Sequence, residues 1–265
     1  MLFDAHNHLQ DAALAPHFPG VLSDLQRIGL ARAVVNGATE ADWERVASLA
    51  EEHPWVLPSY GLHPWFIKER SPHWRERLTE LIENGRAAVG EIGLDRWIED
   101  YDFQDQMEVF TWQLALAAQH NLPASIHCLK AWGALWEHLR TQSVPERGFL
   151  LHSYVGPAEM VDGFLKRGAY FSFSGHFLHE RKAAQREVFR HIPVDRLLVE
   201  TDAPDMPLPT QRIQYHLPDT PDGRSLNHPA NLHAVYEGLA ELRGEPSGTL
   251  TAQVAENFQR LFGGV

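Results

Sequence analysis

Short apolar segments recur along this chain, and each is followed by a stretch with helical periodicity. They lie roughly 30 residues apart, the length of a strand, a loop and the helix that follows. Buried strands that alternate with helices indicate a parallel sheet, because parallel strands need a crossover between them. The predicted strands begin near Leu2, Ala31, Val56, Ala87, Ala124, Gly148, Ala169 and Leu197.

Eight such units predict an α/β fold of the (β/α)8 type, a TIM-type barrel. Its usual size is about 250 residues, and this chain has 265. The rival, an open doubly wound sheet, usually carries a glycine-rich phosphate loop after its first strand, where this chain has histidines. We therefore expect a single domain over residues 1–265, with an extra C-terminal helix from about Leu250 to Phe262.

The first predicted strand carries a His-x-His motif, His6-Asn7-His8, two residues after Asp4. Alternate side chains of a strand share a face, so His6 and His8 point the same way, with Asp4 below them. Two imidazoles on one rigid strand suit a divalent transition metal, since each can offer a neutral nitrogen. The motif also occurs by chance, so it does not establish a site alone.

Four later predicted strands also end on residues that can bind a metal: Glu91, His127, His152 and Asp202. Each has an ordinary structural explanation when taken singly. A buried histidine can be satisfied by hydrogen bonds in the core, and a carboxylate can stabilise a loop or turn. In a barrel, however, the carboxyl ends of all strands meet at the face that holds the active site. Their shared position favours one site.

The predicted cluster of His6, His8, Glu91, His127, His152 and Asp202 offers six ligands. One tetrahedral zinc takes four, whereas two ions about 3.5–4 Å apart could share six. Glu91 is the natural bridge, because a carboxylate can give one oxygen to each ion. We expect two divalent ions, Mg²⁺, Mn²⁺ or Zn²⁺, that lower the pKa of bound water. Asp202 could bind one ion and accept the proton of the attacking water.

The formal net charge of −12 argues against a protein that coats duplex DNA, because such a protein presents a broad basic face. A nuclease remains possible, since metal ions supply positive charge where a phosphate binds. Cys128 is the only cysteine, so no intramolecular disulfide can form and a reducing compartment is expected. With no leader-like segment and no long apolar run, we expect a cytoplasmic monomer or weak oligomer that does not bind membranes.

Several motifs, spread over the whole chain, resemble the TatD-type metal-dependent deoxyribonucleases of the amidohydrolase-like superfamily. They are Asp4-Ala5-His6-Asn7-His8, Gly61-Leu62-His63-Pro64, Gly90-Glu91-Ile92-Gly93-Leu94-Asp95, Ile126-His127, Leu151-His152, Phe173-Ser174-Gly175 and Glu200-Thr201-Asp202-Ala203-Pro204. The resemblance implies a metal-dependent phosphodiesterase with the six ligands above and with His63 near the substrate phosphate. Members of the family cut DNA, often from the 3′ end, and some have been linked to RNA or aminoacyl-tRNA substrates.

The positions around the substrate depart from the family's pattern. Leu129 stands where an arginine is usual, so the nearest cation is Lys130, which we expect to contact phosphate together with His63. Trp65 stands where a second histidine is common, and Trp97 lies near the usual place of another aromatic residue. Four aromatic residues follow strand ends and either stack unpaired bases or pack at the rim: Trp65, Trp97, Tyr154 and Phe177.

Three functions stay open at this point. The favoured one is a two-metal hydrolase that trims single-stranded or frayed DNA, an exonuclease acting at the 3′ end. The second is an amidohydrolase acting on a small amide or ester. Related binuclear enzymes generally place a carboxylated lysine on strand four, where this chain has Glu91. The third is a non-catalytic nucleic-acid-binding protein, for which buried histidines and carboxylates without metal would be costly.

Overall fold

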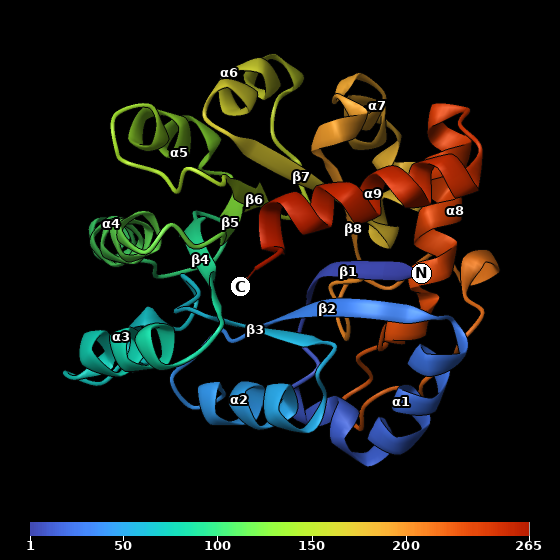
Figure 1. Cartoon of the computed structure of the whole chain (residues 1–265), viewed down its shortest axis with the longest axis horizontal. Coiled ribbons are helices and arrows are strands. Elements are labelled where there is room, and N and C mark those ends of the chain that lie inside the picture. The colour runs from blue at the N-terminus through green and yellow to red at the C-terminus, as the bar shows by residue number, and fades with distance from the viewer. Residues whose placement is uncertain (265) are drawn as a thin grey trace.

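Eight parallel strands follow one another around a single sheet in chain order, as the computed structural model of residues 1–264 shows (Figure 1). The strands are β1 (Leu2–Asn7), β2 (Leu30–Asn36), β3 (Val56–Tyr60), β4 (Ala88–Asp95), β5 (Ala124–Leu129), β6 (Phe149–Leu151), β7 (Ala169–Ser174) and β8 (Leu197–Glu200). Each begins within one residue of its predicted start. The prediction of a (β/α)8 barrel is confirmed.

Two backbone hydrogen bonds connect the end of β1 to the segment after β8. The N–H of Asp202 donates to the carbonyl of His6 at 3.0 Å, and the N–H of His8 donates to the carbonyl of Ala203 at 2.7 Å. They bring the first and last strands together at the carboxyl ends of the strands, the face that we call the mouth. The earliest and latest predicted ligands therefore lie side by side.

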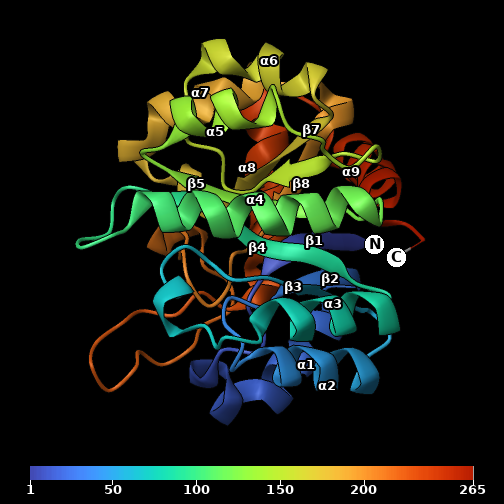
Figure 2. The ribbon, with the colours of Figure 1, turned by 90° about the vertical axis from the view of Figure 1, so that its left-hand side faces the viewer.

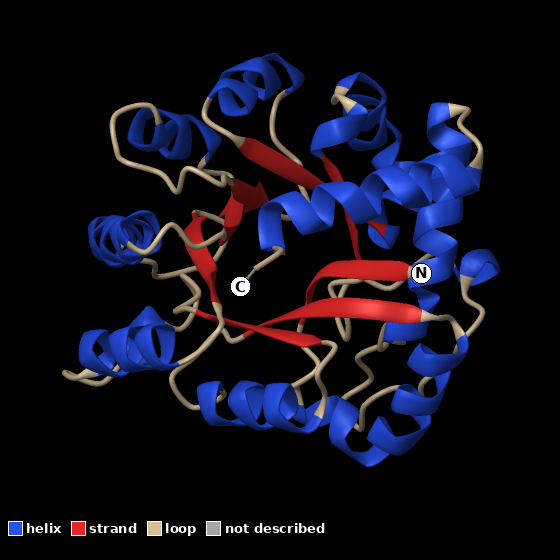
Figure 3. Ribbon diagram, in the orientation of Figure 1, coloured by secondary structure: helices blue, strands red, loops and turns tan. Residues whose placement is uncertain are grey.

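Helices surround the sheet (Figure 3). They are α1 (Phe18–Arg27), α2 (Trp43–Glu52), α3 (Trp74–Asn84), α4 (Phe103–Gln119), α5 (Trp132–Leu139), α6 (Val161–Lys166), α7 (Ala183–His191), α8 (Leu232–Arg243) and α9 (Ser247–Phe262). The extra C-terminal helix is α9, and it packs on β1, where the rings of Phe3 and Phe258 lie 4.9 Å apart. No helix within residues 1–264 has both the length and the apolar character needed to cross a membrane.

The start of α2 differs from the pattern in the sequence, where Thr39 looks like the cap of a helix that begins directly after it. The helix begins at Trp43. Asp42 is the reason, because its carboxylate accepts hydrogen bonds from the backbone N–H groups of Ala38 at 3.1 Å and Thr39 at 3.3 Å. A carboxylate that binds the backbone before it stabilises a turn there instead of a first helical turn.

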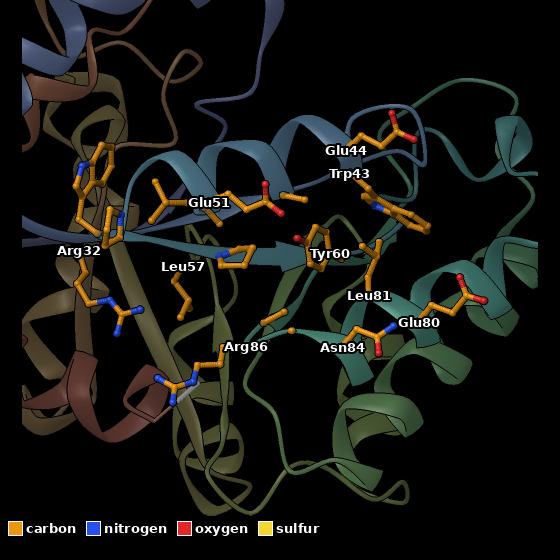
Figure 4. A pocket seen from close by; sticks show the side chains of 18 of the residues that line it. Arg32, Trp43, Glu44, Glu51, Leu57, Tyr60, Glu80, Leu81, Asn84 and Arg86 are labelled. Atoms are coloured by element: carbon orange, nitrogen blue, oxygen red, sulfur yellow. The ribbon is translucent and has the colours of Figure 1, made fainter.

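The loops at the mouth lie opposite the two chain ends. In the side view, the N and C labels lie at one end of the barrel, while the loop between β8 and α8 extends at the other (Figure 2). A separate hollow of about 1040 Å³ lies between α2 and α3, on the outer side of β3. Figure 4 shows Glu44 and Glu80 toward one end of the hollow and Arg32 and Arg86 toward the other, with Glu51 between them. This hollow is distinct from the mouth.

Candidate metal centre

Glu91 lies between two groups of histidines, and its two oxygens face different groups. Oε2 lies 3.4 Å from Nε2 of His6 and 3.3 Å from Nε2 of His8. Oε1 lies 2.8 Å from Nε2 of His152 and 3.2 Å from Nδ1 of His127. The Glu91 side chain is buried in the barrel interior. It is therefore placed to serve both groups at once.

The group around Oε2 also contains Asp202, which follows β8. Asp202 Oδ1 lies 3.6 Å from Nε2 of both His6 and His8, and these two nitrogens lie 3.3 Å apart. The distances follow from the hydrogen bonds that hold the end of β1 beside Asp202. Two ring nitrogens and two carboxylate oxygens thus converge on one point.

Hydrogen bonds on the far side of the first two rings fix their orientation. His8 Nδ1 lies 2.8 Å from the carbonyl oxygen of Asn36. That oxygen can only accept, so Nδ1 carries a proton and Nε2 is the nitrogen that faces the cluster, where it can offer a lone pair once it has lost its own proton. His6 Nδ1 lies 2.8 Å from the hydroxyl of Ser125, which holds the ring so that its Nε2 also faces the cluster. Facing lone pairs are the arrangement that a cation stabilises.

The group around Oε1 contains His127, His152 and also His63. His127 Nε2 donates to Asp95 Oδ2 at 2.9 Å, so its Nδ1 lone pair faces Glu91. His63 Nε2 lies 3.3 Å from Glu91 Oε1. The structure thus places His63 inside the cluster, where it can act as a ligand. Its contact with a substrate phosphate stays a prediction.

The electrostatics of the cluster keep the carboxylates ionised. Burial alone would raise the pKa of Glu91, but the imidazoles of His63, His152 and His6 outweigh it and hold that pKa well below its usual range. Burial also opposes ionisation of Asp202, yet the nearby imidazoles, with His8 first, lower its pKa to about 2. Burial lowers the pKa of His63 to about 4. Ionised carboxylates and a neutral imidazole are the forms that bind metals.

The donor set therefore suits divalent metal ions. All six predicted ligands lie in one cluster, and their donor atoms fall into three close groups: His6 with His152 and Asp202, His6 with His8 and Glu91, and His63 with Glu91 and His127. Mixed imidazole and carboxylate donors suit zinc, manganese and related ions.

Two further residues lie where the sequence did not predict a role. Asp95, at the end of β4, orients His127, and Glu200, at the end of β8, lies with Oε1 3.7 Å from Nδ1 of His152. Asp95 shares the strand face of Glu91 by alternation, and this signal could have identified it. The predicted substrate contact Lys130 lies just after β5 with a φ of 55° and is exposed, outside the cluster.

Comparison with known proteins identifies the family of this chain. The model of the family "TatD related DNase" matches residues 3–263. The 3'-5' ssDNA/RNA exonuclease TatD of Erwinia tasmaniensis is 31% identical, over 98% of this chain and 99% of its own length. The metal-dependent hydrolase YjjV of Escherichia coli is 29% identical, over 98% of this chain and 96% of its own length.

Solved structures give the same result. The crystal structure of YjjV, a TatD homolog from Escherichia coli, aligns with a TM-score of 0.89 over 98% of this chain and 97% of that one. A TatD family hydrolase from Entamoeba histolytica, 18% identical, aligns with a TM-score of 0.83 over 99% and 98% of the two chains and shows the same fold. The chain belongs to the TatD family of metal-dependent hydrolases.

Proposed function

We propose that this protein is a deoxyribonuclease that uses two divalent ions, Mg²⁺, Mn²⁺ or Zn²⁺, to remove nucleotides from single-stranded or frayed DNA ends. The observation that carries this proposal is the division of Glu91, whose two oxygens face different histidines: Oε2 faces His6 and His8, and Oε1 faces His127 and His152. Two-metal sites are typical of enzymes that cut phosphodiester bonds. A relative named 3'-5' ssDNA/RNA exonuclease is consistent with this activity and suggests the 3′ end as the point of attack.

Different residues of the chain have different roles in the proposed hydrolysis. His6, His8 and Asp202 would hold one ion, and His127 and His152 the other, with Glu91 between them. When bound, such a pair lowers the pKa of water and offsets the negative charge of the phosphate. Asp202, which is ionised and belongs to the first group, would also accept the proton that the attacking water loses.

His63 and Lys130 complete the proposed substrate contacts. His63 is neutral at pH 7, because burial lowers its pKa to about 4. Its Nδ1 accepts the backbone N–H of Trp65 at 3.2 Å, so Nε2 carries the proton that His63 would donate to a phosphate oxygen without adding charge. Lys130 is exposed beside the mouth and supplies a positive charge. A chain of net charge −12 depends on few such contacts, so we expect a shallow dependence of log affinity on log salt, with a slope of about −1 to −3.

A hydrolysis panel tests the function. Purified protein is supplied with Mg²⁺, Mn²⁺ or Zn²⁺ and offered single-stranded DNA, duplex DNA, RNA and a small phosphodiester, with a chelator control. We expect metal-dependent shortening of single-stranded DNA, and end-labelled strands report the polarity. Intact nucleic acids together with hydrolysis of a small amide or ester would instead show an amidohydrolase. Binding of DNA without any hydrolysis would show a non-catalytic protein.

A further inference from the structure

Two tryptophans at the mouth are exposed although their rings are large and apolar. Trp65 follows β3 and is 43% exposed, and Trp97 follows β4 and is 57% exposed. The other two aromatic residues predicted at strand ends, Tyr154 and Phe177, are buried and serve as packing. Of these four residues, Trp65 and Trp97 alone present a ring that can stack on a ligand.

The two rings continue outward from the metal cluster. The ring of His63 meets the ring of Trp65 edge-on, with centroids 5.2 Å apart. The rings of Trp65 and Trp97 are stacked, with centroids 6.2 Å apart and planes inclined by 28°. Because His63 faces Glu91 Oε1, this pair, the Trp65–Trp97 ledge, begins beside the His127 group.

Asp95 connects the Trp65–Trp97 ledge to the metal cluster through hydrogen bonds. Its Oδ2 accepts a hydrogen bond from Nε1 of Trp65 at 2.7 Å and another from Nε2 of His127 at 2.9 Å. Its Oδ1 accepts the backbone N–H of Trp97 at 2.5 Å. A single carboxylate thus sets the position of both tryptophans relative to a predicted metal ligand.

The loops that carry the two tryptophans are also tied to each other. Lys68, three residues after Trp65, donates to the carbonyl of Asp100 at 2.6 Å. Arg70 ties the loop of Trp65 to α4 as well, through a bidentate pair with Asp105 at 2.9 and 2.7 Å. A surface held in this way loses little freedom when a ligand binds, so it retains more of the contact energy.

We propose that the Trp65–Trp97 ledge binds the unpaired base of the terminal nucleotide and so places the adjoining phosphodiester at the metal centre. The proposal rests on the proposed nuclease function and names the part of the substrate that the site recognises. Stacking needs a free aromatic face and no particular base, so the ledge tolerates any sequence. Because it contacts the base and not the 2′-hydroxyl, it does not distinguish DNA from RNA.

A comparison of base and enzyme variants tests the ledge during turnover. The substrates are two single-stranded oligonucleotides that end in either deoxyadenosine or an abasic nucleotide, and the enzymes are wild type, Trp97→Ala and Trp65→Ala. Loss of the base should lower the kcat/KM of wild type about 5- to 150-fold, the value of one stacked base. Loss of the base should have little effect on the kcat/KM of Trp97→Ala or of Trp65→Ala. Tyr101→Ala, which removes another exposed aromatic ring from the loop after β4, should retain the wild-type ratio.

An equilibrium measurement separates the ledge from the nuclease proposal. Deoxyadenosine monophosphate and 2-deoxyribose 5-phosphate are each titrated into wild type and Trp97→Ala, and calorimetry reports the affinity. Tighter binding of the nucleotide by about 5-fold or more in wild type, with equal binding of both probes by Trp97→Ala, would support the ledge even if no phosphodiester is cleaved. Equal binding of the probes by wild type, or a base preference that survives in Trp97→Ala, would overturn it.

Discussion

Asp95 Oδ2 lies 2.9 Å from Nε2 of His127, so the carboxylate that ends β4 fixes the imidazole that stands on β5. The hydrogen bond leaves the proton on Nε2 and directs the lone pair of Nδ1 toward Glu91, 3.2 Å away. Partners of this kind orient a metal ligand and raise its basicity.

Asp95→Asn should therefore weaken metal binding at the His127 side of the centre by about 10- to 100-fold. An amide has one acceptor oxygen instead of two and no charge, so it orients His127 less firmly. Calorimetric titration of the metal-free protein measures the change. Asp100→Asn is the control, because Asp100 contacts Lys68 through its backbone carbonyl, which the substitution keeps. Equal affinities for wild type and Asp95→Asn would show that Asp95 does not support the ligand.

Asp202→Asn should retain most of the bound metal and lose several orders of magnitude in kcat, because an amide cannot accept the proton of water. Metal content by elemental analysis and single-turnover rates separate the two effects. Glu91→Ala should instead lose metal, since its oxygens serve both groups. Near wild-type turnover of Asp202→Asn at saturating metal would assign the base to another residue.

Metal affinity should increase as the pH rises through the neutral range. Burial alone would lower the pKa values of His8 and His152, but the carboxylates around them, Glu91 above all for His152, raise both well above the usual value. Both rings are then protonated at pH 7 in the metal-free protein and must release protons to bind metal. Calorimetry in buffers of different ionisation enthalpy counts the protons. If metal binding released no protons, or if the metal affinity fell as the pH rose, His8 and His152 would not be protonated in the metal-free protein.

Asp4 should make the metal-free protein less stable as the pH rises from about 4 to about 7. Burial raises the pKa of Asp4 to about 7 from 3.8, although hydrogen bonds from Thr201 oppose the shift. In that window the folded state holds a proton that the unfolded state has lost, so the free energy of unfolding declines as pH increases. The total is on the order of 4 kcal/mol at 1.36 kcal/mol per pKa unit.

The comparison of wild type with Asp4→Asn isolates this effect. Urea denaturation of both proteins in chelator, at pH 5 and pH 8, gives four free energies of unfolding. Asp4→Asn should lose less stability than wild type between the two pH values, because the amide does not titrate. An equal loss in both proteins would place the pH dependence in other groups.

The strands were predictable because each is an apolar run bounded by polar or turn-forming residues. The predicted start of α2 was wrong because the helix-capping propensity of Thr39 does not reveal that the side chain of Asp42 binds the preceding backbone. Gly93 is a case where the structure explains the sequence. A Cβ there would lie 1.9 Å from the carbonyl oxygen of His127, so only glycine allows β4 and β5 to approach so closely.

The membership of the metal cluster was likewise predictable, because barrel strands deliver their carboxyl ends to one face. The sequence also led us to expect one oxygen of Glu91 for each of two ions, but which histidines face which oxygen was not predictable. That depends on the irregular register of β4 against β5 between Val89 and Ile92, which alternation alone does not give. The inward position of His63 depends in the same way on the course of the loop after β3.

The contacts between β1 and the segment after β8 set the moment in biosynthesis at which the enzyme is complete. A ribosome delivers His6 and His8 first and Asp202 only after most of the chain has emerged, so a nascent chain without its last quarter has histidines but no closed centre. Hydrogen bonds that span almost 200 positions, such as that from Thr201 to Asp4, form late because distant segments must first meet. A chain that ends before Asp202 therefore lacks one of the ligands of the metal cluster and cannot form the complete centre.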